Sequence, residues 1–368
     1  MEFRAALLAR SGAPLVVESV RLLGLRDTDV LVRMEAAGLC HTDLEAQQGG
    51  FATVLPVILG HEGAGIVEEV GRAVRSVRPG DKVVCSPIPA CGSCFYCCRD
   101  RPMLCEPVMA GHRAGRLPDG QPRLHWAGHD VAQFLCVSSF AQYAVVPETG
   151  AVRIPQEMPS DRACLLGCAL ITGAGAVLHV APVQPGENVC VVGCGPVGLS
   201  VIQGARMAGA GQIIALDPNP ARRALAVRFG ASHVSEGDEG AVLDEVRSLT
   251  DGRGADHVFE TAGAPSALRA ALEVTRPGGT TTLLGKLPPQ DLASVRYGSL
   301  MGDKTIRRSS LGGARVREDI PVFAQAYLDG KLMLDEMITE RIALQDVAAG
   351  LERVRARSTI RTVIDRFE

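Results

Sequence analysis

The sequence predicts an α/β protein of two domains, a strand-rich barrel and a doubly wound parallel sheet. The chain of 368 residues exceeds the usual size of one domain. Short β-like runs broken by turns fill its beginning, whereas strands alternate with helical segments after Gly186. The second pattern is typical of βαβ units, which bury both faces of a parallel sheet.

The barrel is predicted from β-like runs separated by turn signals such as Arg78-Pro79-Gly80-Asp81. These runs cover residues 15–20, 29–38, 64–71 and 82–87. Residues 85–127 then look loop-like, rich in Cys, Gly and Pro, and hydrophobic burial alone would not fix their shape. We therefore expect a local clamp such as a metal ion there.

The second domain is predicted from strands at residues 187–193, 212–217, 256–263 and 279–286. Helices are expected from Pro196 and over residues 219–230. Beyond about Ser310, amphipathic helices near 319–329 and 344–357 and a strand at 360–365 are expected to complete the first domain. We thus assign residues 1–169 and 311–368 to the first domain and 170–310 to the second.

Charge and hydropathy patterning favour a small-molecule enzyme over a nucleic-acid or membrane protein. The formal net charge is −3, and no long Lys/Arg block provides a footprint for nucleic acid or an anionic membrane. The start of the chain makes a poor signal peptide, so a cytoplasmic location is expected. Residues 163–186 lack formal charge, but Gly173, Gly175, Pro182 and Pro185 favour a buried helix over a membrane span.

Four of the twelve cysteines form one short-range cluster, Cys91-x2-Cys94-x2-Cys97-x7-Cys105. Four thiolates in one loop can surround a tetrahedral zinc ion and leave no open coordination position, so this zinc is expected to order the loop at residues 85–110. Cys98 could in principle ligate in place of Cys97. Most of the cysteines without an assigned role are expected to be small core residues; these are Cys85, Cys98, Cys136, Cys164, Cys190 and Cys194.

A dinucleotide site is predicted where Gly193-Cys194-Gly195-Pro196-Val197-Gly198 follows a strand and opens a helix. The glycines let the backbone approach a pyrophosphate, which would lie on the N–H groups of the helix N-terminus. Asp217 ends the next strand, where its carboxylate can bind ribose hydroxyls and repel a 2′-phosphate. NAD is therefore favoured over NADP, although Arg222 or Arg223 could accept a phosphate by swinging inward.

Three further segments complete a resemblance to a known family. They are Gly38-Leu39-Cys40-His41-Thr42-Asp43, Gly60-His61-Glu62-Gly63 and Gly167-Cys168-Ala169-Leu170-Ile171-Thr172-Gly173. With the cysteine loop and the glycine fingerprint, the whole chain resembles the zinc-dependent medium-chain alcohol dehydrogenases. That resemblance implies a GroES-like catalytic domain, a Rossmann domain, NAD, and two zinc ions per subunit. It also implies that Cys40, His61 and Cys168 hold a catalytic zinc that stabilises an alkoxide for hydride transfer.

The resemblance also implies roles for the neighbours of these ligands. Asp43 is expected to orient His61, and Glu62 to lie behind the zinc as an occasional ligand. Thr42 matches the hydroxyl that accepts the substrate proton. Many members end this relay on a histidine three positions later. Here Glu45 stands there, so either Glu45 or water takes the proton.

Coenzyme and substrate contacts follow from the same resemblance. His41 and Arg361 match positions that contact the coenzyme pyrophosphate. Pro87 replaces a frequent aromatic wall of the alcohol pocket, while Phe140 keeps an aromatic residue. A wider pocket suits aryl, allylic or terpenoid alcohols better than ethanol. The alternative substrate is an S-(hydroxymethyl)thiol adduct such as that of glutathione. The long-loop form favours a homodimer, and a tetramer is possible.

A non-enzymatic alternative is a sensor or scaffold that keeps the nucleotide fold without turnover. The joint presence of Cys40, Thr42, His61 and Cys168 speaks against it, since a protein without turnover need not keep open-site ligands. A secreted disulfide protein conflicts with the chain length and the cysteine spacing.

Overall fold

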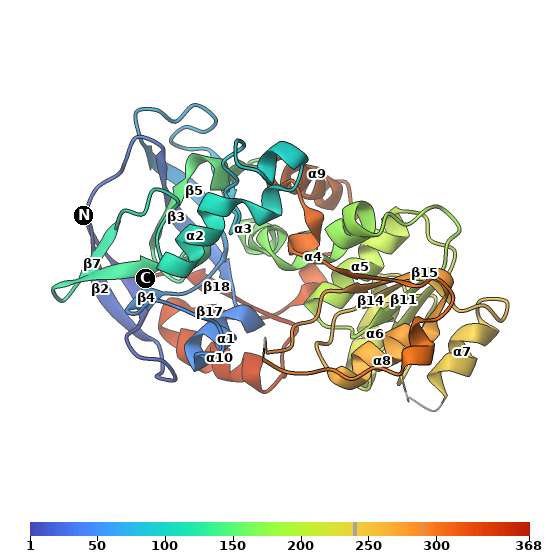
Figure 1. Ribbon diagram of the computed structural model, residues 1–368. Helices are drawn as coiled ribbons and strands as arrows, with labels where there is room; N and C mark the ends of the chain where they lie inside the picture. Colours follow the sequence, from blue (N-terminus) through green and yellow to red (C-terminus); the bar gives the residue numbers. More distant parts are fainter. Residues whose placement is uncertain (238–240, 289) are drawn as a thin grey trace. The chain divides into compact units, whose positions relative to one another are not determined.

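The computed structural model describes residues 1–237, 241–288 and 290–368. The chain divides into two compact units, which we call unit 1 and unit 2. Unit 1 comprises Met1–Cys168 and Arg315–Glu368, and unit 2 comprises Ala169–Ala314. Unit 1 therefore contains both chain ends, and unit 2 is one continuous inserted segment (Figure 1).

Unit 1 is rich in short strands. A closed barrel has the order β1-β2-β7-β8-β4, and a seven-stranded sheet has the order β10-β6-β5-β3-β18-β17, with β9 also paired to β3. The strands are β1 Glu2–Leu8, β2 Val16–Leu22, β3 Asp29–Gly38, β4 Val57–Ile58, β5 Glu62–Val70, β6 Lys82–Cys85, β7 Leu124–Trp126, β8 His129–Gln133, β9 Tyr143–Pro147, β10 Ala151–Arg153, β17 Ile338–Ala343 and β18 Arg361–Arg366.

Unit 1 also contains helices between its strands. They are α1 His41–Gln48, α2 Glu106–Ala114, α3 Ser160–Ala163, α9 Val316–Leu328 and α10 Val347–Arg355, with the short turns η5 Cys164–Gly167 and η9 Asp335–Met337. Helix α2 lies where the sequence suggested only loop. Pro107 in its first turn and the left-handed Gly115 at its end bracket just nine residues, too few for a clear helical period.

Unit 2 is a parallel six-stranded sheet with the order β13-β12-β11-β14-β15-β16. All its pairings are parallel, and the order reverses between β11 and β14, which is the topology of a doubly wound fold. Its strands are β11 Val189–Val192, β12 Ile213–Leu216, β13 His233–Ser235, β14 Ala255–Glu260, β15 Thr275–Leu283 and β16 Thr305–Arg308. Its helices are α4 Ala169–Gly175, α5 Pro196–Met207, α6 Pro220–Phe229, α7 Val242–Ser248 and α8 Pro265–Val274 (Figure 1).

The two units thus confirm the predicted α/β fold, a strand-rich unit and a doubly wound parallel sheet. Among the described residues, no single helix is both long and apolar enough to cross a bilayer. One bent pair, Ser160–Gly167 with Ala169–Val180, passes that test only when its two members are taken together. Its residues are mostly buried, as expected for core helices.

Candidate metal centres and dinucleotide loop

The predicted ligands Cys40, His61 and Cys168 come together in unit 1 with a fourth group, Glu62. Their candidate ligand atoms all lie within 4.8 Å of one another. Two thiolates and one imidazole form a donor set that suits zinc and leaves a position for water or substrate. Glu62 adds a carboxylate beside these three ligands, as expected for a group behind the metal.

Cys40 is placed by the start of helix α1. It is the N-cap residue, and its backbone N–H donates to Asp43 Oδ2 at 3.0 Å. A carboxylate at this third helical position satisfies a backbone donor that the helix itself cannot, and its charge favours the helix N-terminus. The helix start thereby holds Cys40 and Asp43 in a fixed relation.

Asp43 also fixes the tautomer of His61. The two side chains are completely enclosed, and His61 Nδ1 lies 3.0 Å from Asp43 Oδ1. Asp43 Oδ1 accepts a second hydrogen bond, from the backbone N–H of Gly60 at 3.0 Å. Because the carboxylate only accepts, Nδ1 carries the proton and Nε2 is left to bind a metal.

The backbone beside His61 requires glycine. Gly60 has a φ of +91°, and a Cβ there would lie 2.5 Å from Ser139 Oγ. A Cβ at Gly38, on the facing strand, would lie 2.4 Å from Glu62 Oε2. The Gly60-His61-Glu62 segment and its partner strand therefore pack too closely for side chains at these positions.

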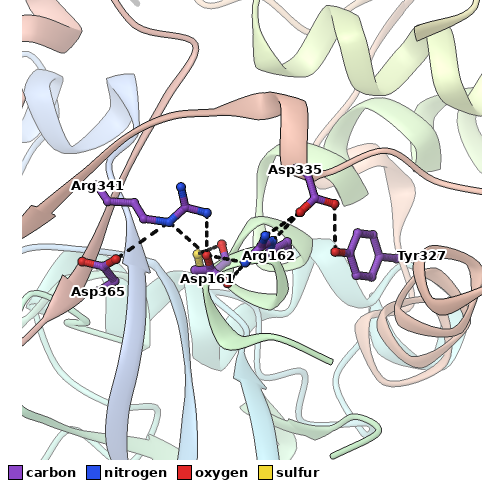
Figure 2. A network of polar contacts seen from close by, with 7 residues as sticks. Asp161, Arg162, Tyr327, Asp335, Arg341 and Asp365 are labelled. Carbon is purple, nitrogen blue, oxygen red and sulfur yellow. Dashed lines mark hydrogen bonds and ion pairs between the residues drawn. The ribbon is translucent and has the colours of Figure 1, made fainter. Parts of the chain in front are cut away.

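Cys168 follows the turn η5, and an ion-pair network anchors the chain just before it (Figure 2). Asp161 on α3 accepts from Arg341 on β17 at 2.8 Å, and it also pairs with its neighbour Arg162. Arg162 in turn donates to Asp335 at 2.8 Å, and Asp335 accepts from the hydroxyl of Tyr327. This network connects α3 to α9 and β17. It therefore fixes the start of the α3–η5 segment that leads to Cys168.

Glu62 and Arg361 form a buried ion pair beneath the ligand cluster. Arg361 Nη2 lies 2.9 Å from Glu62 Oε1, and Arg361 Nη1 donates to the carbonyl of Leu39 at 2.8 Å. Burial raises the pKa of Glu62 to about 8, although the charge of Arg361 acts in the opposite direction. The predicted contact of Arg361 with a pyrophosphate stays a prediction, since its described contacts all lie within unit 1.

The protonation of the ligands indicates how a metal would enter. A hydrogen bond from Cys168 lowers the pKa of Cys40, and the same bond raises the pKa of Cys168 well above its ordinary value. Burial disfavours a charged His61, but Asp43 and Cys40 outweigh it and raise the pKa of that ring. These directions favour a thiolate on Cys40 and protons on Cys168 and His61, and metal binding would have to displace those protons.

The second cluster contains Cys91, Cys94, Cys97 and Cys105, whose sulfur atoms lie within 4.8 Å of one another. The backbone N–H groups of Ser93 and Cys94 point at the sulfur of Cys91 and lower its pKa to about 6. Preformed N–H donors around a thiolate favour metal binding. Cys98 lies outside the cluster and donates to the carbonyl of Ser93 at 3.4 Å, so the four-cysteine set with Cys97 fits a structural zinc. The remaining unassigned cysteines are buried.

The glycine fingerprint lies between β11 and α5 of unit 2. Gly193 has a φ of +98°, and a Cβ on Gly198 would lie 1.9 Å from the carbonyl oxygen of Gly193. By contrast, a Cβ on Gly195 would meet no described atom within 4 Å. Gly193 thus allows the left-handed turn, and Gly198 allows the helix to pack close to the loop. Gly195 is the N-cap of a helix that begins with Pro196 and Val197, and it leaves accessible backbone for a pyrophosphate.

Asp217 follows β12, beside this loop. Its carboxylate accepts from the backbone N–H groups of Cys194 and Asn219, both at 2.8 Å. Arg222 Nη1 lies 4.0 Å from the same carboxylate, whereas Arg223 donates to the carbonyl of Asp217 and pairs with Glu236. An acidic group locked at the second strand end fits a ribose and disfavours a 2′-phosphate, as expected for NAD.

The remaining predicted residues occupy helix α1 and the segments around it. Thr42 is 9% exposed and lies two positions after Cys40 in the first turn of α1. His41 is largely exposed, and its Nε2 lies 3.8 Å from Glu45 Oε1 one turn later. Their roles in the proton relay and in coenzyme binding stay predictions.

Aromatic side chains near His61 were not fully anticipated. Phe140 is completely buried in the core of unit 1. The ring that packs edge-on against His61 is Phe134, with centroids 5.9 Å apart, and Phe51 packs edge-on against Phe134 at 5.6 Å. Sequence spacing could not indicate this contact, because residues 51, 61 and 134 meet only through the folding of the barrel.

Comparisons with known proteins cover the whole chain. The family model described as alcohol dehydrogenase GroES-like domain matches residues 26–156, and that described as zinc-binding dehydrogenase matches residues 196–326. The S-(hydroxymethyl)glutathione dehydrogenase of Komagataella pastoris is 37% identical over 98% of this chain and 97% of its own length. The alcohol dehydrogenase class-3 of Myxine glutinosa is 36% identical over the same shares.

Solved structures resemble the chain over its full length. A structure titled alcohol dehydrogenase zinc-binding domain protein, from Burkholderia ambifaria, has a TM-score of 0.95 and 34% identity, with 100% of both chains covered. The benzyl alcohol dehydrogenase of Acinetobacter calcoaceticus has a TM-score of 0.93 and 29% identity, again over 100% of both chains.

Proposed function

The chain belongs to the zinc-dependent medium-chain alcohol dehydrogenases, and on that premise we propose that it acts on bulky primary alcohols. It is an oxidoreductase whose cofactors are NAD and zinc. The proposed substrates are aryl, allylic or terpenoid alcohols and the corresponding aldehydes. The observation that carries this proposal is the aromatic packing at a metal ligand: Phe134 packs edge-on against His61, and the partly exposed ring of Phe51 packs edge-on against Phe134.

Pro87 supports the same substrate class. It stands where many family members carry an aromatic wall, and its smaller side chain leaves more room for a ring. The resemblance to a benzyl alcohol dehydrogenase structure adds independent support. The buried Arg123 of unit 1 is paired with Asp29, so it is not offered to an anionic substrate.

Each group of the site has a proposed task. A zinc ion bound there would supply Lewis acidity toward the alcohol oxygen, and a bound NAD would supply the hydride acceptor. Cys40, His61 and Cys168 hold the metal, Asp43 orients His61, and Thr42 takes the hydroxyl proton.

The far end of the relay and the coenzyme contacts are assigned in the same way. Glu45, three positions after Thr42, is proposed to receive the proton from Thr42, with water as the other acceptor. His41 and Arg361 are assigned to the pyrophosphate, and the loop from Gly193 to Gly198 supplies backbone donors.

A second candidate substrate is the S-(hydroxymethyl) adduct of glutathione. It is favoured by the names of relatives at 36–37% identity over nearly their whole length. NADH absorbance with ethanol, benzyl, allylic and glutathione-adduct substrates separates the two candidates, and a repeat with NADP tests coenzyme choice. Greater kcat/KM on ethanol than on benzyl or allylic alcohols would overturn the proposal. A clear preference for the glutathione adduct would replace it.

We also propose a cytoplasmic homodimer formed through the edge of the unit 2 sheet. Strand β16 is the last strand of that sheet, and all four of its residues are exposed, including the apolar Ile306. An exposed edge strand can pair with the same strand of a second copy. Light scattering after gel filtration tests this, with a single-chain mass as the contrary result.

A further inference from the structure

His112 on α2 contacts the segment that follows β6. Its Nε2 lies 2.8 Å from the carbonyl oxygen of Pro87. Because a carbonyl oxygen only accepts, Nε2 carries the proton and Nδ1 keeps a lone pair that can accept. The ring is half-buried, and nothing in the described part of the chain provides a hydrogen-bond partner for Nδ1.

The Pro87 segment begins beside the catalytic metal ligands. Cys85, the last residue of β6, flanks both ligand segments: a Cβ on Gly63 would lie 3.6 Å from the Cys85 Cβ, and one on Gly167 would lie 3.1 Å from its carbonyl oxygen. Gly63 is two residues from His61, and Gly167 directly precedes Cys168. The chain that leaves β6 toward Pro87 therefore starts at the ligand cluster.

Helix α2 is held against this segment by apolar packing. Val108 and Met109 belong to the same cluster of side chains as Ile88 and Ala90. His112 lies one turn beyond Val108 and is fixed by its bond to Pro87. The imidazole is thus positioned by its hydrogen bond to Pro87 and by the packing of the helix that carries it.

His112 lies within the electrostatic field of the metal site but is itself uncharged at neutral pH. Burial lowers the pKa of His112 to about 4, and the charge of His61 adds to that lowering. A neutral imidazole with its proton on Nε2 offers Nδ1 as an acceptor and offers no positive charge. It suits an O–H donor and gives no charge attraction to a carboxylate.

We propose that His112 is a specificity residue whose Nδ1 accepts a hydrogen bond from a second hydroxyl of the substrate. The substrate class is a hydroxylated aryl alcohol, such as a hydroxybenzyl alcohol, with its carbinol at the metal and its phenolic O–H at His112. This inference rests on the proposed function, because it needs an aryl alcohol bound beside His61.

The test compares benzyl alcohol with the three hydroxybenzyl alcohols and their methoxy counterparts. In the unmodified enzyme, one hydroxybenzyl isomer is expected to exceed its methoxy counterpart about 10-fold in kcat/KM, mainly through KM, because a methoxy group cannot donate. His112→Gln can still donate to the Pro87 carbonyl but lacks an acceptor at the place of Nδ1. It should lower the hydroxybenzyl-to-benzyl ratio of kcat/KM about 10-fold.

Arg113→Gln is the matched control, since Arg113 is exposed on the same helix and should leave the ratio unchanged. Circular dichroism and a zinc content equal to that of the unmodified enzyme establish that the variants are folded. An unchanged ratio in His112→Gln, with no preference of the unmodified enzyme for hydroxy over methoxy, overturns the assignment of His112 alone. Absence of activity on every benzylic alcohol overturns both the proposed function and this inference.

Discussion

Replacement of Asp43 by asparagine should weaken the catalytic metal site selectively. The Asp43 carboxylate accepts three hydrogen bonds of 3.0 Å, from Cys40 N–H, Gly60 N–H and His61 Nδ1–H. In D43N the amide oxygen can still accept from Gly60 N–H and His61 Nδ1–H. The amide NH2 group then faces the backbone N–H of Cys40, and two donors cannot form a hydrogen bond. Losing one buried charge-assisted hydrogen bond costs about 1.5–3 kcal/mol.

That cost corresponds to a loss of about 10- to 100-fold in zinc affinity, the usual range for groups that orient a metal-bound imidazole. The assay is zinc release to a chromogenic chelator, followed as two kinetic phases. The phase from the Cys91 cluster serves as an internal reference, because none of its ligands contacts Asp43. Asp27→Asn, which removes an exposed carboxylate elsewhere in unit 1, is the matched control.

An unchanged rate of the catalytic phase in D43N would refute the reasoning. It would mean that the geometry around Cys40 and His61 is fixed by packing alone. Faster release of both phases would point instead to a general loss of structure, which thermal denaturation would reveal.

Further predictions concern metal uptake, stability and the coenzyme. The pKa values of His61 and Cys168 are both raised without a metal, so zinc uptake at the catalytic site, with the Cys91 cluster already filled, should release about two protons, and its affinity should rise with pH. Calorimetry in buffers of different ionisation enthalpy measures this, and proton-independent uptake would contradict it. Arg123→Met removes the side chain that donates to both carboxylate oxygens of the buried Asp29. The free energy of unfolding, measured by denaturant titration, should fall by about 3–5 kcal/mol. A fall below about 1 kcal/mol would show that water reaches Asp29. Asp217→Ser should raise the ratio of kcat/KM for NADP over NAD about 10- to 100-fold, and a constant ratio would show that this carboxylate does not select the coenzyme.

Short-range patterns predicted the parts of the molecule whose geometry is local. The glycine fingerprint lies between a strand and a helix because its turn needs Gly193 in the left-handed region and its helix needs Gly198 against the strand. The cysteine cluster forms within one loop, so spacing alone indicated its members. Helix boundaries were less predictable: α9 begins at Val316, before Pro321, although a proline usually marks a helix start.

Contacts between residues far apart in sequence were the part of the structure that the sequence did not predict. Arg123 and Asp29 form a buried ion pair although they are 94 positions apart in sequence. No motif around either residue predicts this pair. Phe51, Phe134 and His61 likewise meet only in the folded barrel. A contact between residues far apart in sequence can be predicted only when a family pattern names both partners, as it does for Cys40 and Cys168. Contacts outside such a pattern are seen only in the folded structure.

The substrate question therefore depends on residues that no motif marks. The ligands and the carboxylate that orients His61 determine what chemistry is possible, and they are held by backbone hydrogen bonds that tolerate little variation. Phe51, Pro87 and His112 take no part in those hydrogen bonds: Phe51 packs against Phe134, and His112 binds the carbonyl of Pro87. On the proposed function, a neutral acceptor at residue 112 and the aromatic ring beside His61 would favour an aryl substrate. On the same proposal, a cation at residue 112 would attract a carboxylate, so a single substitution on α2 would change substrate selectivity without altering the metal ligands.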